Sequence, residues 1–436
     1  MRESMQSGME QIPFDPGDAG ATLRSLPERP AVFALYGADA HAEPYIGRTP
    51  NLRGRLERLL QPSAKHPRRL QLAGRVRRIA WRLTGSDFES LLLQFELLEE
   101  IYGEKALKRM HLGAPAFIRY LGSNAYPRIA VTNRPSQREA AWSYGPFASR
   151  LAAERFADEA LKLFLLRRCV DELDPNPGHP GCVYSEMKMC LAPCYQGCTD
   201  ERYGEEATAV ESFLATRGES RLVTLRTERE AASADLEFER AAALHAQVQR
   251  VEGVRSLAAE LVRPLSQLRA VILQASANPG EVAVFLFEGG RLCGPVGFST
   301  LGMRIQNEQS GSTSLFAQPM AIEPIPEEPA AEAQSVEQVQ AEPMADAPAR
   351  VPRGLLEARL EAALTDLRAL AEPPSATTRQ GHLALVKRWY YRPEVRRVGE
   401  ICFPDEEDRW PLKSMVRGAG RVAGKMLAAN PAKVNA

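Results

Sequence analysis

The chain has 436 residues, of which 44 % are hydrophobic and 25 % charged, a composition ordinary for a globular protein of about three domains. Its 55 Lys and Arg residues balance 55 Asp and Glu residues, which for the chain as a whole argues against a simple nucleic-acid-binding protein. No apolar run approaches the roughly 20 residues that span a bilayer, and the polar N-terminal segment lacks the apolar core of a secretory signal. We therefore expect a cytoplasmic location and no membrane partner.

The N-terminal third predicts a small α/β domain over residues 27–112, preceded by a disordered segment, 1–26. Apolar patterning indicates strands at 31–37, 44–48 and 76–84, and helices at 51–60 and 88–103. Between Tyr45 and Arg82 the chain carries eleven Arg and Lys residues and one acid, Glu57. The overall charge balance therefore conceals a strongly basic region.

The remainder divides by composition into five further segments. Residues 113–199 are expected to form a linker domain with strands at 117–122 and 128–134, a helix at 150–166, and a cysteine cluster. Residues 200–260 predict a helical hairpin, and 261–304 a β-hairpin with a turn at 278–280. Residues 305–352 read as a disordered acidic linker, because 305–349 hold eight acids and no Lys or Arg. Residues 353–436 predict a small helical and basic module. The expected fold class is therefore α/β with added α-helical parts.

The basic region carries residues suited to phosphate chemistry. Tyr45 lies on the second predicted strand, Arg48 follows it, and Arg55 lies on the next helix. Arginine holds phosphate through paired charge-assisted hydrogen bonds, and a nearby phenol can steer or accept a proton. The alternative is a solvated basic face with a half-buried tyrosine.

The run YIGRTPNLRGRLERL, eleven residues after AVF, resembles the GIY-YIG nuclease domain in the form found in the UvrC family, the incising subunit of bacterial nucleotide excision repair. The resemblance implies catalytic roles for Tyr45, Arg48 and Arg55, with Mg²⁺ or Mn²⁺ as the catalytic metal. Two positions depart from the family pattern: Phe33 replaces a tyrosine, and Gln94 replaces the metal-binding glutamate. A neutral amide is a poorer Mg²⁺ ligand than a carboxylate. We therefore expect a degenerate nuclease site, with weak incision or none.

Further arginines in the same region are candidates for contacts with DNA phosphates. They are Arg53, Arg58, Arg68, Arg69 and Arg75.

Five cysteines are concentrated in one segment. Cys169, Cys182, Cys190 and Cys194 are spaced 13, 8 and 4 apart, and Cys198 follows. Four thiolates this close suit tetrahedral zinc or an iron–sulfur cluster, and the alternative is buried free cysteines. The run CVYSEMKMCLAPC, downstream of LRRC, is similar to the cysteine segment of the UvrC family. That resemblance implies a [4Fe–4S] cluster on the first four cysteines and leaves Cys198 outside the pattern.

The helical hairpin has small and apolar residues at helical spacing, which is most often the packed core of such a pair. Its LEFERAA run, residues 236–242, resembles the UVR motif. The resemblance implies docking onto a UvrB-like subunit. The candidate contact residues are Leu236, Phe238, Ala241 and Leu244.

The last third departs from the family pattern. Residues 281–298 look like the opening strands of the family's second nuclease domain, which has an RNase H fold, but its acidic triad and helix-hairpin-helix pair do not follow. Trp389, Tyr390 and Tyr391, flanked by basic residues, could stack on bases, or could belong to a small packed module. Two functions remain: a UvrC-like protein that binds DNA and UvrB with a degenerate nuclease site, or a non-catalytic adaptor of the repair complex.

Overall fold

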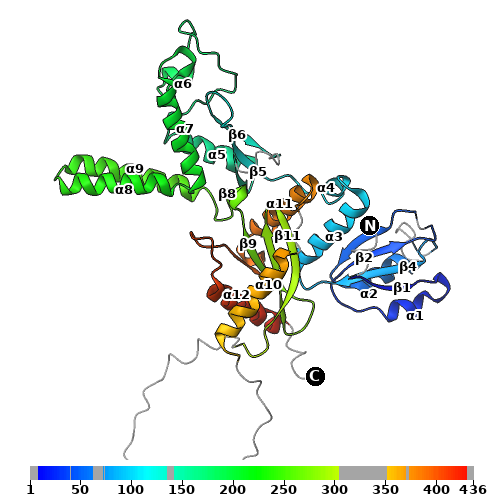
Figure 1. Ribbon diagram of the computed structural model, residues 1–436. Helices are drawn as coiled ribbons and strands as arrows, with labels where there is room; N and C mark the ends of the chain where they lie inside the picture. Colours follow the sequence, from blue (N-terminus) through cyan, green and yellow to red (C-terminus); the bar gives the residue numbers. More distant parts are fainter. Residues whose placement is uncertain are drawn as a thin grey trace, which may run out of the picture.

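The computed structural model describes residues 8–39, 41–61, 72, 74–134, 142–303, 351–369 and 373–429. These form three antiparallel four-stranded sheets with helices packed around them, so the expected α/β class with added helices is confirmed (Figure 1). Within these ranges, every helix is too short or too polar to cross a bilayer.

The N-terminal sheet has the strand order β1-β4-β2-β3. Its elements are β1 (Glu10–Pro13), α1 (Ala19–Arg24), β2 (Ala31–Tyr36), β3 (Tyr45–Thr49), α2 (Leu52–Leu60), β4 (Arg78–Leu83), α3 (Asp87–Tyr102) and α4 (Lys105–Arg109). The strands and helices predicted for residues 31–103 are confirmed. Asn51 and Ser86 start α2 and α3 by accepting hydrogen bonds from Gly54 N and Glu89 N, which satisfies otherwise unpaired amides.

The expectation of disorder before residue 27 is wrong for residues 8–26. Strand β1 pairs along β4, and Phe14, Leu23 and Leu26 are buried in the core beneath the sheet. The segment is ordered because it pairs with the outer edge of β4 and buries these apolar side chains in the domain core. Its polar composition does not predict this pairing.

The middle sheet has the order β6-β5-β7-β8 and carries the cysteine segment and the hairpin. Its elements are β5 (Ala116–Tyr120), β6 (Ile129–Thr132), β7 (Ser143–Phe147), α5 (Arg150–Leu161), α6 (Val183–Glu186), α7 (Asp200–Ala215), α8 (Glu219–Ala234), α9 (Phe238–Ser256) and β8 (Arg263–Pro264). The hairpin is α8 and α9 alone, which project away from the sheets (Figure 1). Helix α7 instead contributes Tyr203 and Phe213 to the core of the middle domain. The prediction that the hairpin begins at residue 200 is therefore wrong.

The C-terminal sheet has the order β11-β10-β9-β12. Its elements are β9 (Ala270–Ala275), β10 (Glu281–Glu288), β11 (Arg291–Ser299), α10 (Arg353–Ala369), α11 (Ala376–Tyr390), β12 (Glu400–Cys402) and α12 (Leu412–Ala429). The predicted strands and the turn at 278–280 are confirmed. Of the predicted acidic linker, 305–352, residues 305–350 lie outside the described residues.

Residues 353–429 are not a separate module, which corrects the sequence-based division. Strand β12 pairs antiparallel with β9, and α10 and α12 bury Leu360 and Met415 against one face of the sheet. Helix α11 covers the other face with Leu385 and Trp389. Residues 353–429 join the strands β9, β10 and β11 because a three-stranded sheet that is apolar on both faces needs helices on both sides.

Helix α3 lies between the N-terminal and C-terminal sheets. Leu93 and Leu97 pack against the N-terminal sheet, whereas Phe88 and Phe95 enter the core shared with α11 and the C-terminal sheet. At the crossing of α3 and α11, Gly381 lies directly on the Phe95 ring. Helix α3 therefore joins the core of the N-terminal sheet to a second apolar core that it shares with the C-terminal part.

Candidate functional site

The position where the resemblance expects a first tyrosine is occupied by a core residue. Phe33 on β2 is 0 % exposed and lies opposite Gly47 of β3, whose missing side chain makes room for its ring. The ring centroids of Phe33 and Tyr45 are 6.1 Å apart. The structure thus brings Phe33 and Tyr45 together on one face of the sheet. Only Tyr45 of this pair carries a hydroxyl group.

Arg48 lies on the opposite face of β3 from Tyr45, because residues three apart on a strand point to opposite sides. Its guanidinium donates a hydrogen bond to the carboxylate of Asp87, the first residue of α3. Asp87 also accepts a 2.7 Å hydrogen bond from Arg392, just beyond α11. Although burial alone raises it, the pKa of Asp87 is held below its usual value by the hydrogen bonds and charges of Arg392 and Arg48. Arg48 is therefore engaged in an ion pair within the N-terminal domain, and the same carboxylate links this domain to Arg392 of the C-terminal unit.

Arg55 is half-buried on α2 and forms no ion pair with another described residue. Gln94 is half-buried on α3. The nearby acid Glu96 is two residues further on, about 200° around the helix, so it points away from the side that Gln94 occupies. Glu89 accepts a 2.7 Å hydrogen bond from Gly85 N. No carboxylate of α3 thus replaces the missing ligand at position 94.

Among the described residues, no three His, Cys, Asp or Glu side chains are grouped closely enough to hold a metal ion.

The five arginines predicted to contact DNA have different environments. Arg53 donates to Leu26 O at 2.8 Å and pairs with Glu28, so it holds α2 to the segment after α1. Arg58 bonds Gly54 O in its own helix, whereas Arg75 is exposed. Arg68 and Arg69 lie outside the described residues. Of the described three, Arg58 and Arg75 keep exposed side chains.

The cysteine segment brings four thiols into mutual electrostatic range. The pKa of Cys190 is raised first by burial and then by Cys182, Cys194 and Cys169. Burial likewise raises the pKa of Cys194, with further contributions from Cys182 and Cys169. The backbone that carries them is tightly turned, with left-handed conformations at Ala192 and Gln196. These are the four cysteines that the sequence pattern selects.

Cys198 stands apart from this group. Its pKa is raised by burial and by Asp200, and none of the other cysteines contributes. The described cysteines are all free thiols. Zinc and iron–sulfur clusters use thiolate ligands of this kind, but the four thiols are not grouped closely enough in this structure to hold a metal ion.

The turn between α8 and α9 presents two apolar side chains to solvent. Leu236 is 70 % exposed and Phe238 66 % exposed. Leu244 is only 7 % exposed and Ala241 is half-buried, and both pack against the hairpin and middle-domain core. The prediction of partner contact thus agrees with the exposure of Leu236 and Phe238, whereas Leu244 serves the chain's own core because it faces α8.

The aromatic run near the C-terminus is part of the core, so base stacking by Trp389 is excluded in this fold. Trp389 is buried and donates to Val398 O at 3.0 Å. Tyr391 donates to Pro146 O of β7 at 2.9 Å. Trp389 is therefore a packed residue, but it belongs to the core of the C-terminal unit and not to a small separate module. The sequence did not single out Asp87 and Arg392, because their partners are distant in the chain and only folding brings them together.

Comparisons with known proteins agree with these observations. The family described as the UvrC/Cho excinuclease middle domain matches residues 117–213, and the UvrB/uvrC motif matches residues 219–254. The chain thus combines a segment that matches the UvrC-type middle domain with a hairpin that matches the UVR motif.

Its relatives match over 61–69 % of the chain. It is 28 % identical over 267 residues to the UvrABC system protein C of Alcanivorax borkumensis, covering 61 % of this chain and 43 % of that protein. The corresponding protein of Ectopseudomonas mendocina is 28 % identical over 305 residues, covering 69 % of this chain and 48 % of the relative. The chain thus spans less than half the length of these curated relatives. No solved structure matches the chain.

Proposed function

We propose that the protein acts in nucleotide excision repair by binding DNA and docking onto a UvrB-like subunit through the tip of the α8–α9 hairpin. The observation that carries the proposal is the exposure of Leu236 and Phe238 at the turn of a hairpin that matches the UVR motif. Large apolar side chains held out to water on a rigid hairpin gain free energy when a partner covers them.

The docking proposal is tested by capture of purified UvrB on the immobilised full chain. Phe238→Ala is expected to weaken capture at least tenfold, because truncating a central aromatic anchor typically costs about 2 kcal/mol or more of binding free energy. Val223→Ala is the matched control, because Val223 is 55 % exposed on α8 but lies away from the turn. Equal capture by wild type and Phe238→Ala would contradict the proposal.

We further propose that the N-terminal sheet is a GIY-YIG-type domain whose nuclease chemistry is degenerate. Tyr45 and Arg55 are retained, but Phe33 is a buried ring without a hydroxyl and Gln94 is a neutral amide. Where a catalytic Mg²⁺ or Mn²⁺ would polarise the scissile phosphate, this chain lacks the carboxylate to hold it. Weak incision, if present, would rest on Tyr45 and Arg55, with Arg48 released from Asp87.

A nicking assay on damaged duplex DNA with UvrB and Mn²⁺ separates an enzyme from an adaptor. We expect the natural chain to cut weakly or not at all and the double variant Phe33→Tyr, Gln94→Glu to gain activity. Tyr45→Phe added to that variant should remove the gain. Robust cutting by the natural chain that Tyr45→Phe abolishes would show that the site is intact.

We also propose that Cys169, Cys182, Cys190 and Cys194 bind a [4Fe–4S] cluster. The proposal is supported by the mutual influence of these four thiols and by the exclusion of Cys198 from it. A cluster there would supply cross-linking of the irregular segment, and redox chemistry if it is exposed to an oxidant. Anaerobic purification with iron and sulfide counts tests it. One zinc per chain in a colourless protein would replace the cluster with a zinc site.

The C-terminal unit is proposed to be a relative of an RNase H-type domain that has no cutting site. Strand β9 carries no acid, Glu288 pairs with Arg269 and Arg368, and Glu400 pairs with Arg421. Carboxylates neutralised by arginines are poor ligands for a pair of catalytic metal ions. The unit is therefore assigned a scaffolding role against α3.

A further inference from the structure

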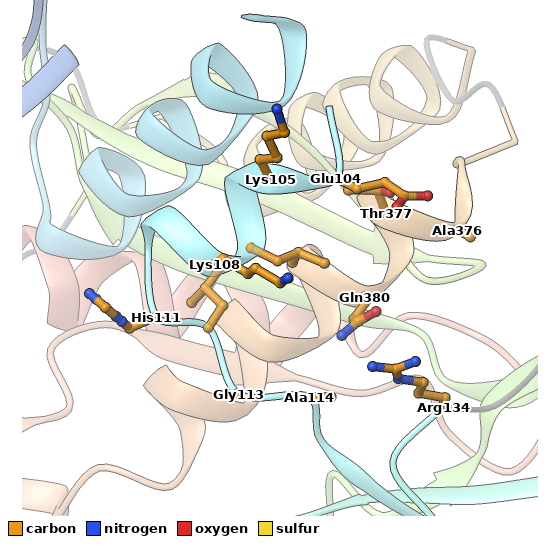
Figure 2. Close-up of a pocket in the computed structure, with 12 residues that line it drawn as sticks. Glu104, Lys105, Lys108, His111, Gly113, Ala114, Arg134, Ala376, Thr377 and Gln380 are labelled. Atoms are coloured by element: carbon orange, nitrogen blue, oxygen red, sulfur yellow. The ribbon is translucent and has the colours of Figure 1, made fainter. Parts of the chain in front are cut away.

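A basic hollow of about 930 Å³ lies between α4, the end of β6 and the start of α11, one element from each of the three sheet-bearing parts (Figure 2). Its polar and charged lining residues are Glu104, Lys105, Lys108, His111, Arg134, Thr377 and Gln380. This volume falls in the range of small-ligand sites, so the hollow admits a few nucleotides of a single strand rather than a duplex.

Three side chains from these elements converge on the hollow. Figure 2 shows the head groups of Lys108, Arg134 and Gln380 pointing toward one another, whereas His111 points away from the centre. Neither Lys108 nor Arg134 forms an ion pair with a described carboxylate, although the adjacent Arg109 pairs with Glu43. Two converging cations repel each other, and an anion between them would remove that repulsion.

The hollow also has an apolar lining, which consists of Leu107, Leu112, Ala114 and Ala376. An apolar lining combined with two cations and an amide donor suits a nucleotide, because a base or sugar covers the apolar side chains while its phosphate accepts from Lys and Arg. Inorganic phosphate would use only the cations and leave the apolar lining exposed to water.

We propose that this hollow binds the phosphodiester backbone of single-stranded DNA, with Lys108 and Arg134 on the phosphate and Gln380 as an additional donor. The inference rests on the proposed DNA-binding function and assigns that function a site outside the nuclease-like face. It also places a strand across the junction of the three domains.

The test measures binding of a labelled oligothymidylate of about 12 nucleotides to the full chain over a range of salt concentrations. The double variant Lys108→Ala, Arg134→Ala is expected to bind about tenfold more weakly near ~0.15 M salt and to lower the salt slope by about 1.4, roughly 0.7 for each lost contact. Gln380→Glu, which adds a negative charge without removing a cation, should also weaken binding.

The control variant is Lys162→Ala, Arg202→Ala, which removes two cations that pair with Glu159 and Glu206 away from the hollow. Its salt slope should match that of the wild type. UvrB capture is measured on every variant, and we expect it to be unchanged, so loss of docking and loss of strand binding are read separately.

Three results would overturn the proposal. One is a salt slope unchanged by the double variant. Another is wild-type DNA binding by Gln380→Glu, which would show that a negative charge in the hollow does not affect the strand. The third is a wild-type chain that does not bind the oligothymidylate but does bind inorganic phosphate or free thymidine monophosphate, and whose binding of that small ligand depends on Lys108. That result would assign the hollow to a small metabolite.

Discussion

Arg392 donates a 2.7 Å hydrogen bond to Asp87, and this contact joins residues 305 positions apart in the chain. The same carboxylate accepts from Arg48, the basic residue that follows the YIG run. Asp87 therefore links the nuclease-like sheet to the C-terminal unit and determines where the Arg48 guanidinium lies. An arginine held in this way must exchange its partner before it can bind a DNA phosphate.

Breaking this link tests its contribution to stability. Asp87→Asn is expected to lower the free energy of unfolding by about 0.5–1 kcal/mol at pH 7, a modest value because solvent screens a partly exposed pair. The folded-state pKa of Asp87 is lowered, so the stabilisation is present above its unfolded value near ~3.9 and is lost as the pH falls through the lower folded value. Urea unfolding at pH 7 and pH 3 measures the difference between wild type and variant.

The matched control is Glu43→Gln, which removes the partner of Arg109 in an exposed pair within the N-terminal domain. A loss of stability with Asp87→Asn no larger than that of the control would show that the link between the domains contributes nothing beyond an ordinary surface pair.

For Glu96 we expect the opposite dependence of stability on pH. Burial raises its pKa to about 7, although Arg82 and Arg291 lower it. A folded pKa above the unfolded value near ~4.3 means that Glu96 stabilises the fold least at high pH, because folding then requires a buried charge. Glu96→Gln should therefore raise the urea midpoint more at pH 8 than at pH 5. A lower midpoint at pH 8 would show that the two arginines outweigh burial.

The crossing of α3 and α11 is tested at Gly381. An added Cβ there would lie 2.0 Å from Phe95 Cζ, so Gly381→Ala is expected to destabilise the protein by about 1–3 kcal/mol. The sign is informative, because Gly to Ala inside a helix otherwise stabilises by about 1 kcal/mol. Gly253→Ala on α9, with nothing within 4 Å, is the control and should stabilise. Phe95→Leu in the Gly381→Ala background should recover part of the loss.

The hairpin separates binding from folding. Leu244→Ala is expected to cost about 2–4 kcal/mol of stability, because this side chain is buried between α9 and the rest of the core. Phe238→Ala should change stability by less than about 0.5 kcal/mol, because its ring is exposed. Thermal unfolding of both variants checks this. A large loss with Phe238→Ala would mean that the ring supports the fold rather than a partner.

Local patterns in the sequence were sufficient for most individual elements. The apolar spacing predicted β2, β3, α2, β4 and α3, because one buried face imposes a period on each segment. The cysteine spacing predicts a set of four thiols and leaves Cys198 outside it. The LEFERAA run located the hairpin turn where Leu236 and Phe238 are exposed. Each of these features depends on residues close together in the chain.

Pairing between distant segments could not be predicted in this way. A polar N-terminal stretch became β1 because β4 had a free edge, and β12 joined β9 across the predicted linker. Trp389 and its neighbours had the composition of a nucleic-acid-binding tail, yet Trp389 fills the core beneath the sheet. An apolar or aromatic segment shows that it needs a partner, but not which partner it will find.

The sequence by itself therefore determined the resemblance to the UvrC family and the turn of the helical hairpin, and it predicted the cysteine set and the two altered positions, Phe33 and Gln94, since motif and residue type are local properties. Only the tertiary structure decided that Arg48 binds Asp87, that the two C-terminal segments form one unit, and that Lys108 and Arg134 face the same hollow. These relationships arise when three sheets pack together, because packing sets distances between side chains that the covalent chain leaves far apart.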